Sequence, residues 1–106
     1  MKKEFKLKAS EIRKIAPYFG TCMATDKITV EGKKIGYMYR EEPDNIQDSG
    51  WRFFSGTETQ EYVDNPNNME VYDVNTIANY DKAIIPYLSR PTGTELDRIE
   101  GTNDFE

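Results

Sequence analysis

The chain has 106 residues, of which 37% are hydrophobic and 31% are charged, a composition typical of a soluble globular domain. It has no histidine and a single cysteine, Cys22, so it lacks intrachain disulfides and the commonest general base and transition-metal ligand. Its net charge of −5 disfavours a simple nucleic-acid binder, and no apolar run approaches the roughly 18 residues of a membrane span. We therefore expect one domain over residues 1–106, without a secretory signal, in the cytoplasm.

The charges are distributed unevenly along the chain. Residues 1–40 hold ten Lys or Arg and four Asp or Glu, whereas residues 41–106 hold four and fifteen. This asymmetry favours a basic protein as the partner of the acidic part. The alternative is that the two parts fold together and their charges interleave.

The N-terminal region predicts a short helix. Residues 2–8 alternate weakly, which indicates an edge strand or a frayed start. After them, Ser10 is a good N-cap, apolar residues recur at helical spacing up to Phe19, and Gly20 is a plausible stop. Pro17 limits this helix to two turns or kinks it.

The next segment predicts a β-hairpin. Residues 21–30 and 35–39 have the composition of strands, and a turn with a glycine at residues 31–33 separates them. Alternation places Tyr37 and Tyr39 on one face of the second strand, together with Ile35. Gly36 leaves a bare position, where another backbone could approach closely.

The heart of the predicted core is the run Gly50-Trp51-Arg52-Phe53-Phe54-Ser55-Gly56, which contains the single tryptophan. Three bulky aromatics in four positions suit a pleated, buried surface. The run predicts a central strand with two different faces. Trp51, Phe53 and Ser55 would lie on one face, and Arg52 and Phe54 on the other.

The remaining elements are short. We expect a polar loop over 41–49, a helix over 57–63 capped by Thr57 or Thr59, a turn over 64–68, and a strand over 69–72. Asp73 and Asp81 each predict the start of a helix, and residues 95–99 predict a last strand. Because strands and helices do not alternate regularly, the predicted fold class is α+β, with a mainly antiparallel sheet and a few short helices.

The sequence shows no catalytic, metal or cofactor motif. Cys22 has no histidine to activate it, so we expect a buried thiol that behaves as a small hydrophobe. The acidic turns at 44–50 and 64–68 lack the ligand spacing of a calcium loop. The adjacent acids Glu41 and Glu42 could do general acid–base work only if the fold held them correctly, and acids in loops are usually solvated.

Four segments resemble one known family. They are Cys22-Met23-Ala24-Thr25-Asp26, Gly36-Tyr37-Met38-Tyr39-Arg40-Glu41-Glu42-Pro43, Asp48-Ser49-Gly50-Trp51-Arg52-Phe53-Phe54-Ser55-Gly56 and Tyr72-Asp73-Val74-Asn75-Thr76-Ile77-Ala78-Asn79-Tyr80-Asp81. Together they resemble the bacterial domain of unknown function that is grouped with polymorphic-toxin immunity proteins, the immunity protein thirty-three type. The resemblance covers residues 20–100, and residues 1–19 match less closely. It implies a small cytoplasmic α+β domain that acts by binding, and it supplies no catalytic residues.

Our functional hypothesis is therefore a non-enzymatic binding protein of the toxin-immunity type, which covers a basic protein toxin with an acidic, aromatic-containing surface. Its candidate partner-binding residues lie in or beside the central strand: Glu41, Glu42, Asp44, Asp48, Trp51, Glu58, Glu61, Tyr62 and Asp64. Trp51 is either an anchor for the partner or wholly part of the core. The carboxylates share a surface only if both acidic loops fold back over one face of the strand. The alternatives are a housekeeping domain with a small-ligand pocket near these loops, and a hydrolase that uses Glu41, Glu42 or Asp48.

Overall fold

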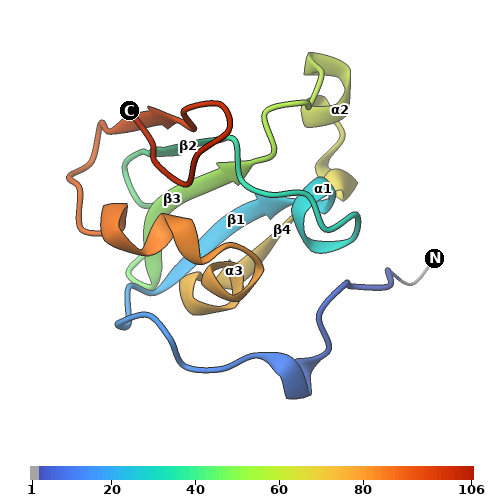
Figure 1. The fold of residues 1–106 in the computed structure, drawn as a ribbon, viewed down its shortest axis with the longest axis horizontal. Coiled ribbons are helices and arrows are strands. Elements are labelled where there is room, and N and C mark those ends of the chain that lie inside the picture. The colour runs from blue at the N-terminus through green and yellow to red at the C-terminus, as the bar shows by residue number, and fades with distance from the viewer. Residues whose placement is uncertain (1–2) are drawn as a thin grey trace.

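The computed structural model describes residues 3–106, which form a five-stranded sheet with the helical segment 74–87 packed on one side (Figure 1). The strand order is β4-β1-β3-β2-β5. The strands are β1 (Thr21–Thr25), β2 (Tyr37–Arg40), β3 (Asp48–Phe54), β4 (Met69–Asp73) and β5 (Glu95–Asp97). Only β1 and β3 pair in parallel, so the sheet is mainly antiparallel and the predicted α+β class is confirmed.

The helices are short, and three of the predicted caps are present, whereas Ser10 lies inside a 3-10 turn instead of capping a helix. The helices are α1 (Asp26–Thr29), α2 (Gln60–Asp64) and α3 (Val74–Tyr80), with 3-10 turns η1 (Ala9–Glu11), η2 (Pro66–Asn68) and η3 (Lys82–Tyr87). The side chains of Thr59, Asp73 and Asp81 each accept a backbone N–H in the first turn of α2, α3 and η3. None of these helices, within residues 3–106, has the length and apolar character needed to cross a membrane.

Strand β3 lies at the centre of the sheet, as the aromatic run predicts. Trp51 and Phe53 are fully buried and stack with their ring centroids 5.9 Å apart. They face α3 and η3, and Nε1 of Trp51 donates a hydrogen bond to the carbonyl of Leu88 at 3.0 Å. Arg52 and Phe54 point to the opposite face, so the predicted faces are confirmed for these four side chains, whereas Ser55 lies beyond the end of the strand.

The predicted hairpin is wrong, because β3 lies between β1 and β2. After Thr25 the chain enters α1 instead of continuing as a strand to residue 30. Ile28 is fully buried there, so core packing overrides the strand propensity of this β-branched segment. Gly36 does allow a close approach: a Cβ at this position would lie 2.1 Å from the carbonyl oxygen of Ser55.

The predicted N-terminal helix is also wrong. Only η1 is helical before β1, and the described residues 3–8 form no strand; Lys2 lies outside the described residues. Two side chains of α3 hold the extended backbone instead. Oδ1 of Asn75 accepts the N–H groups of Ile15 and Ala16 at 2.9 and 3.0 Å, and Asn79 binds both backbone groups of Arg13. These long-range hydrogen bonds replace the helical ones, so local periodicity does not decide the conformation.

Candidate functional site

The sheet has two faces of different character. The helix-covered face packs Trp51 and Phe53 against α1, α3 and η3. We call the other face the open face, since α3 and η3 lie on the opposite side of the sheet (Figure 1). By strand alternation and pairing, it carries Thr21, Met23, Thr25, Tyr37, Tyr39, Asp48, Gly50, Arg52, Phe54, Met69, Val71, Asp73, Glu95 and Asp97.

An aromatic cluster occupies the centre of the open face. Tyr37, Tyr39 and Phe54 lie with each pair of ring centroids 5.8 Å apart, and Tyr39 stacks on Phe54 at an interplanar angle of 13°. The hydroxyl of Tyr37 donates to Oε1 of Glu95 on β5 at 2.8 Å. Burial, together with this carboxylate, raises the pKa of Tyr37 to about 12. The candidate residues did not include these tyrosines, although strand alternation already placed both on one face.

Arg52 organises the first acidic loop over this face. Its side chain is 2% exposed, and its Nε donates to Oε2 of Glu41 at 2.6 Å. Its two Nη atoms donate to both oxygens of Asp48 at 3.0 and 2.8 Å, and Asp44 lies 3.5 Å away. Hydrogen bonds from Arg52 hold the pKa of Asp48 well below its usual range, and those to Asp48 raise the pKa of Arg52.

The three carboxylates around Arg52 have different roles. Asp48 is nearly buried, with 6% of its side chain exposed, and it also accepts the N–H groups of Asp44 and Gly50. Glu41 and Asp44 are 49% and 77% exposed, so they can meet a partner. The cation that these acids surround is the Arg52 guanidinium, and three carboxylates against one cation leave a negative excess. The lowered pKa of Asp48 favours its ionised form, which is opposite to what a general acid needs.

The second acidic loop folds over the same face at the other end of β3. Oε2 of Glu58 accepts the hydroxyl of Thr25 at 2.6 Å and the N–H of Ser55 at 2.8 Å. Burial alone would raise the pKa of Glu58, but these hydrogen bonds and one from the N–H of Gly56 bring it below its usual value. Glu41, Asp44, Asp48 and Glu58 therefore all lie over the open face, although Asp48 and Glu58 mainly fix the loops.

Within residues 3–106, the side chains of the other candidate residues form no hydrogen bond or ion pair with Arg52 or Thr25. Glu42 is exposed in the first loop, and Glu61 and Asp64 are exposed on α2. The ring of Tyr62 lies under the Lys27 ammonium, 5.0 Å from it, and its buried hydroxyl has no hydrogen-bond partner within residues 3–106. Trp51 is fully buried, which is the second of the two roles considered for it.

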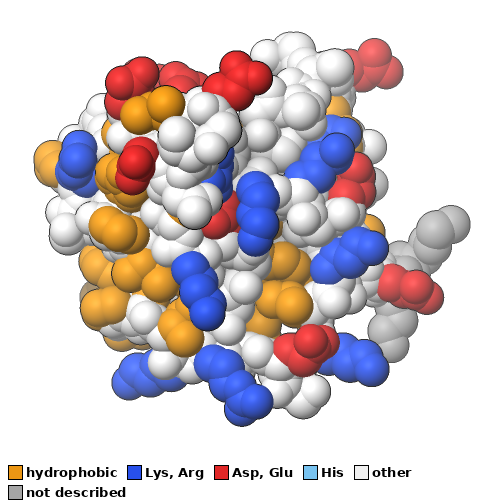
Figure 2. Space-filling view, viewed as in Figure 1, with side chains coloured by type: hydrophobic (Ala, Val, Ile, Leu, Met, Phe, Trp, Pro, Cys, Tyr) orange, Lys and Arg blue, Asp and Glu red, His pale blue; other side chains and the backbone are white. Residues whose placement is uncertain are grey.

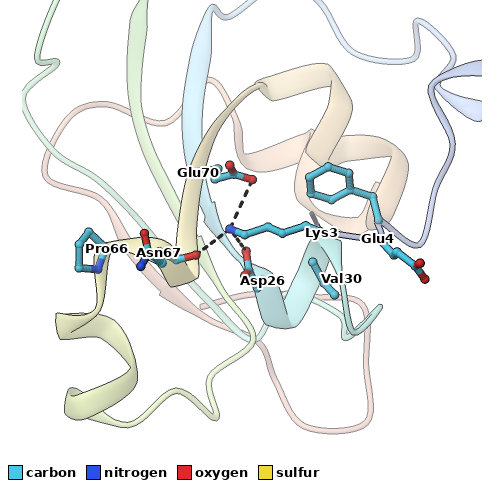
Figure 3. Close-up of a pocket in the computed structure, with 8 residues that line it drawn as sticks. Lys3, Glu4, Asp26, Val30, Pro66, Asn67 and Glu70 are labelled. Atoms are coloured by element: carbon cyan, nitrogen blue, oxygen red, sulfur yellow. Dashed lines mark hydrogen bonds and ion pairs between the residues drawn. The ribbon is translucent and has the colours of Figure 1, made fainter. Parts of the chain in front are cut away.

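The hollow beside the first acidic loop is too small to be the ligand pocket considered in the sequence analysis. A hollow of about 50 Å³ beside Arg52, Asp44 and Val71 is far smaller than the roughly 300 Å³ of a small-molecule site. A larger hollow of about 910 Å³ lies between the N-terminal segment and β4 (Figure 3). In it, Nζ of Lys3 contacts Oδ1 of Asp26, the carbonyl of Asn67 and Oε2 of Glu70 at 2.9, 2.7 and 3.4 Å.

The helix side of the molecule carries both basic and acidic side chains. Figure 2, which shows the helix side of the molecule, has Lys and Arg side chains spread across it and many carboxylates towards its upper edge. Lys34, for example, donates to the carbonyl of Tyr80 at the end of α3. Basic side chains therefore lie on the helix side of the molecule, together with several carboxylates.

The comparisons with known proteins identify a family but no individual relative. Neither the curated proteins nor the solved structures contain a match to this chain. The family model described as the immunity protein Imm33 domain matches residues 22–106, which include α1–α3 and β2–β5 in full and all but the first residue of β1. This match covers four-fifths of the chain and confirms the resemblance inferred from the sequence. The chain therefore belongs to the Imm33 immunity protein domain family.

Proposed function

We propose that this chain is a non-enzymatic, cytoplasmic binding protein of the toxin-immunity type, which contacts its toxin through the open face. One observation carries the proposal: both acidic loops fold onto the face that holds the Tyr37, Tyr39 and Phe54 rings. Aromatic residues surrounded by polar groups are typical of the energetic centres of protein interfaces. The membership of the Imm33 family supports a toxin as the partner.

The charge of the open face suits a basic toxin. Glu41 and Asp44 project from the loop, and Glu95 and Asp97 border the opposite side of the aromatic cluster. An excess of carboxylates accelerates the encounter with a basic partner through long-range attraction. Because Arg52 already holds Glu41, less side-chain entropy is lost when that residue meets a partner.

The test uses a toxin domain whose gene is found next to that of this chain, purified as a catalytically inactive variant. Association is measured at low and physiological salt, and the association rate is expected to fall steeply as salt increases. The double variant Glu42→Lys and Asp44→Lys is expected to associate at least about tenfold more slowly. Its design spares Asp48 and Glu41, whose bonds to Arg52 maintain the loop.

A matched control has the same change in charge on the other side of the molecule. Glu100 and Asp104 are exposed in the turn after β5, and Asn103 of that turn lines a hollow beside α3 and η3. Glu100→Lys with Asp104→Lys is expected to slow association much less. Equal effects of the two double variants would reject the acidic face, and no binding by the wild-type protein would reject the immunity function.

A further inference from the structure

The two edges of the sheet differ in how they are covered. At β5, the chain terminus adds its own pairing: Asp97 and Glu106 exchange N–H to carbonyl hydrogen bonds, both at 2.9 Å. Arg98 and Phe105 continue this pairing as an antiparallel bridge. At the opposite edge, the strand order ends at β4, with no further strand among residues 3–106.

The free backbone groups of β4 follow from its pairing with β1. The N–H of Val74 bonds to the carbonyl of Gly20 at 3.0 Å, and hydrogen-bonded pairs alternate along an antiparallel ladder. Tyr72 therefore faces β1, whereas both backbone groups of Val71 point away from the sheet. On the other side of β1, the N–H of Thr21 bonds to the carbonyl of Gln47 at 2.8 Å, as this alternation requires. Among residues 3–106, the backbone N–H and carbonyl of Val71 have no hydrogen-bond partner outside the sheet.

This edge lacks several usual protections. Five consecutive residue pairs join β4 to β1 without a bulge, and β4 contains neither lysine nor proline. Val71 is 62% exposed, and its side chain lies on the open face, opposite Met23. Proteins generally blunt an exposed edge with bulges, prolines or lysines, because it can otherwise pair with another chain.

Acidic side chains flank the free edge on both sides. On the open face, Asp44 and the Arg52 cluster line the small hollow next to Val71. On the other side, Glu70 and Asp26 line the large hollow, where Lys3 contacts both carboxylates (Figure 3). A strand added to β4 would direct alternate side chains towards these two places.

We propose that an extended segment of the partner toxin, with Lys or Arg at alternate positions, pairs with β4 as a sixth strand. The proposal rests on the proposed function and adds the mode of binding, in which main-chain hydrogen bonds to Val71 provide affinity and the acidic flanks provide specificity. A second copy of this chain fits less well at the same edge. Antiparallel pairing of β4 with itself would bring two acidic open faces together in chains that each carry a net charge of −5.

Hydrogen exchange of backbone amides tests the pairing directly. In the free protein, the Val71 amide is expected to exchange quickly and the Tyr72 amide slowly. Saturation with an inactive toxin domain from a neighbouring gene, if it binds the wild-type chain, is expected to slow exchange at Val71 at least about tenfold, because its N–H acquires an acceptor. Unchanged exchange at Val71 in the saturated complex would overturn the proposal.

Two substitutions separate the backbone from the side chain. Val71→Pro removes the outward N–H at an edge where proline is tolerated, and is expected to weaken toxin binding at least about tenfold. Val71→Thr keeps the N–H and the β-branched shape and is expected to bind within about threefold of wild type. If circular dichroism shows that Val71→Pro does not fold, the exchange experiment decides alone.

The outcomes distinguish the strand pairing at β4 from the proposed toxin-immunity function. Normal toxin binding by a folded Val71→Pro variant overturns the strand pairing and leaves the proposed function intact. No toxin binding by the wild-type protein overturns both. A dimer of the free wild-type chain that Val71→Pro converts to a monomer would assign the edge to a second copy, and would also overturn the proposal.

Discussion

The two faces of the sheet share the same central strand but are stabilised by different interactions. On the helix-covered face, Trp51 and Phe53 are fully buried among aliphatic side chains, which exclude water. On the open face, Arg52 is equally inaccessible, but charged side chains from one loop cover it. Adjacent residues of β3 thus belong to two different environments: Trp51 and Phe53 to the apolar core, and Arg52 to a charged network.

The difference indicates how stability and binding are divided in this molecule. The helix-covered face supplies most of the apolar burial, which is the main favourable term in folding. The open face retains partly exposed tyrosines and carboxylates, which a partner can still desolvate. Substitutions on the first face should therefore affect the free energy of unfolding, and many substitutions on the second face should affect binding.

The largest expected effect is on the helix-covered face. Phe53→Ala should lower the free energy of unfolding by about 3–5 kcal/mol, because it leaves a cavity beside Trp51. Tyr39→Ala, the matched truncation on the open face, should cost only about 1–2 kcal/mol, since its ring is partly exposed. Urea denaturation measures both values. A loss below about 1 kcal/mol for Phe53→Ala would contradict the central position of β3.

Arg52 lies on the open face, but its substitution is expected to affect the free energy of unfolding. Arg52→Met should lower the free energy of unfolding by about 3 kcal/mol, since Asp48 would remain nearly buried without its cation. The double variant Arg52→Met with Asp48→Asn should recover part of this loss, because it removes the unpaired charge. Both are measured by urea denaturation. If the single variant were as stable as wild type, the Arg52 network would not hold the first loop.

The same network predicts a loss of stability in acid. Because the pKa of Asp48 is lowered in the folded protein, ionised Asp48 contributes to the free energy of unfolding. This contribution is fully present above the unfolded pKa of about 4. As the pH falls from there through the folded pKa, this contribution is lost. Denaturation between pH 6 and pH 2.5 should show a steeper decline for wild type than for Asp48→Asn, whose side chain does not titrate. An equal decline in the free energy of unfolding for wild type and Asp48→Asn would show that Asp48 does not cause the acid sensitivity.

The smallest expected effects concern Cys22, which lies on the helix-covered face of β1. It is 1% exposed, and burial raises the pKa of its thiol. Alkylation of the native protein should be at least about a hundredfold slower than in urea, because the reagent needs a local opening and the thiolate is disfavoured. Cys22→Ala should leave toxin binding unchanged. Rapid native labelling would indicate a reactive thiol instead.

The sequence by itself determined the features that depend on neighbouring residues. The alternation in the aromatic run was sufficient to assign opposite faces to Trp51 and Arg52, because strand geometry fixes the period of side chains. The caps Thr59, Asp73 and Asp81 were also predictable, since a cap bonds to N–H groups two or three residues away. The family resemblance was recognisable from such local segments, and the family match bears it out.

Only the tertiary structure decided which distant segments meet. The order of β1, β3 and β2 replaced the expected hairpin, and α3 held the N-terminal segment extended through Asn75 and Asn79. The bonding of Glu41 to Arg52 and the free edge of β4 likewise depend on long-range pairing. Local propensities differ by about 1 kcal/mol or less for ordinary residues, whereas burying one large side chain contributes more, so packing decides these cases.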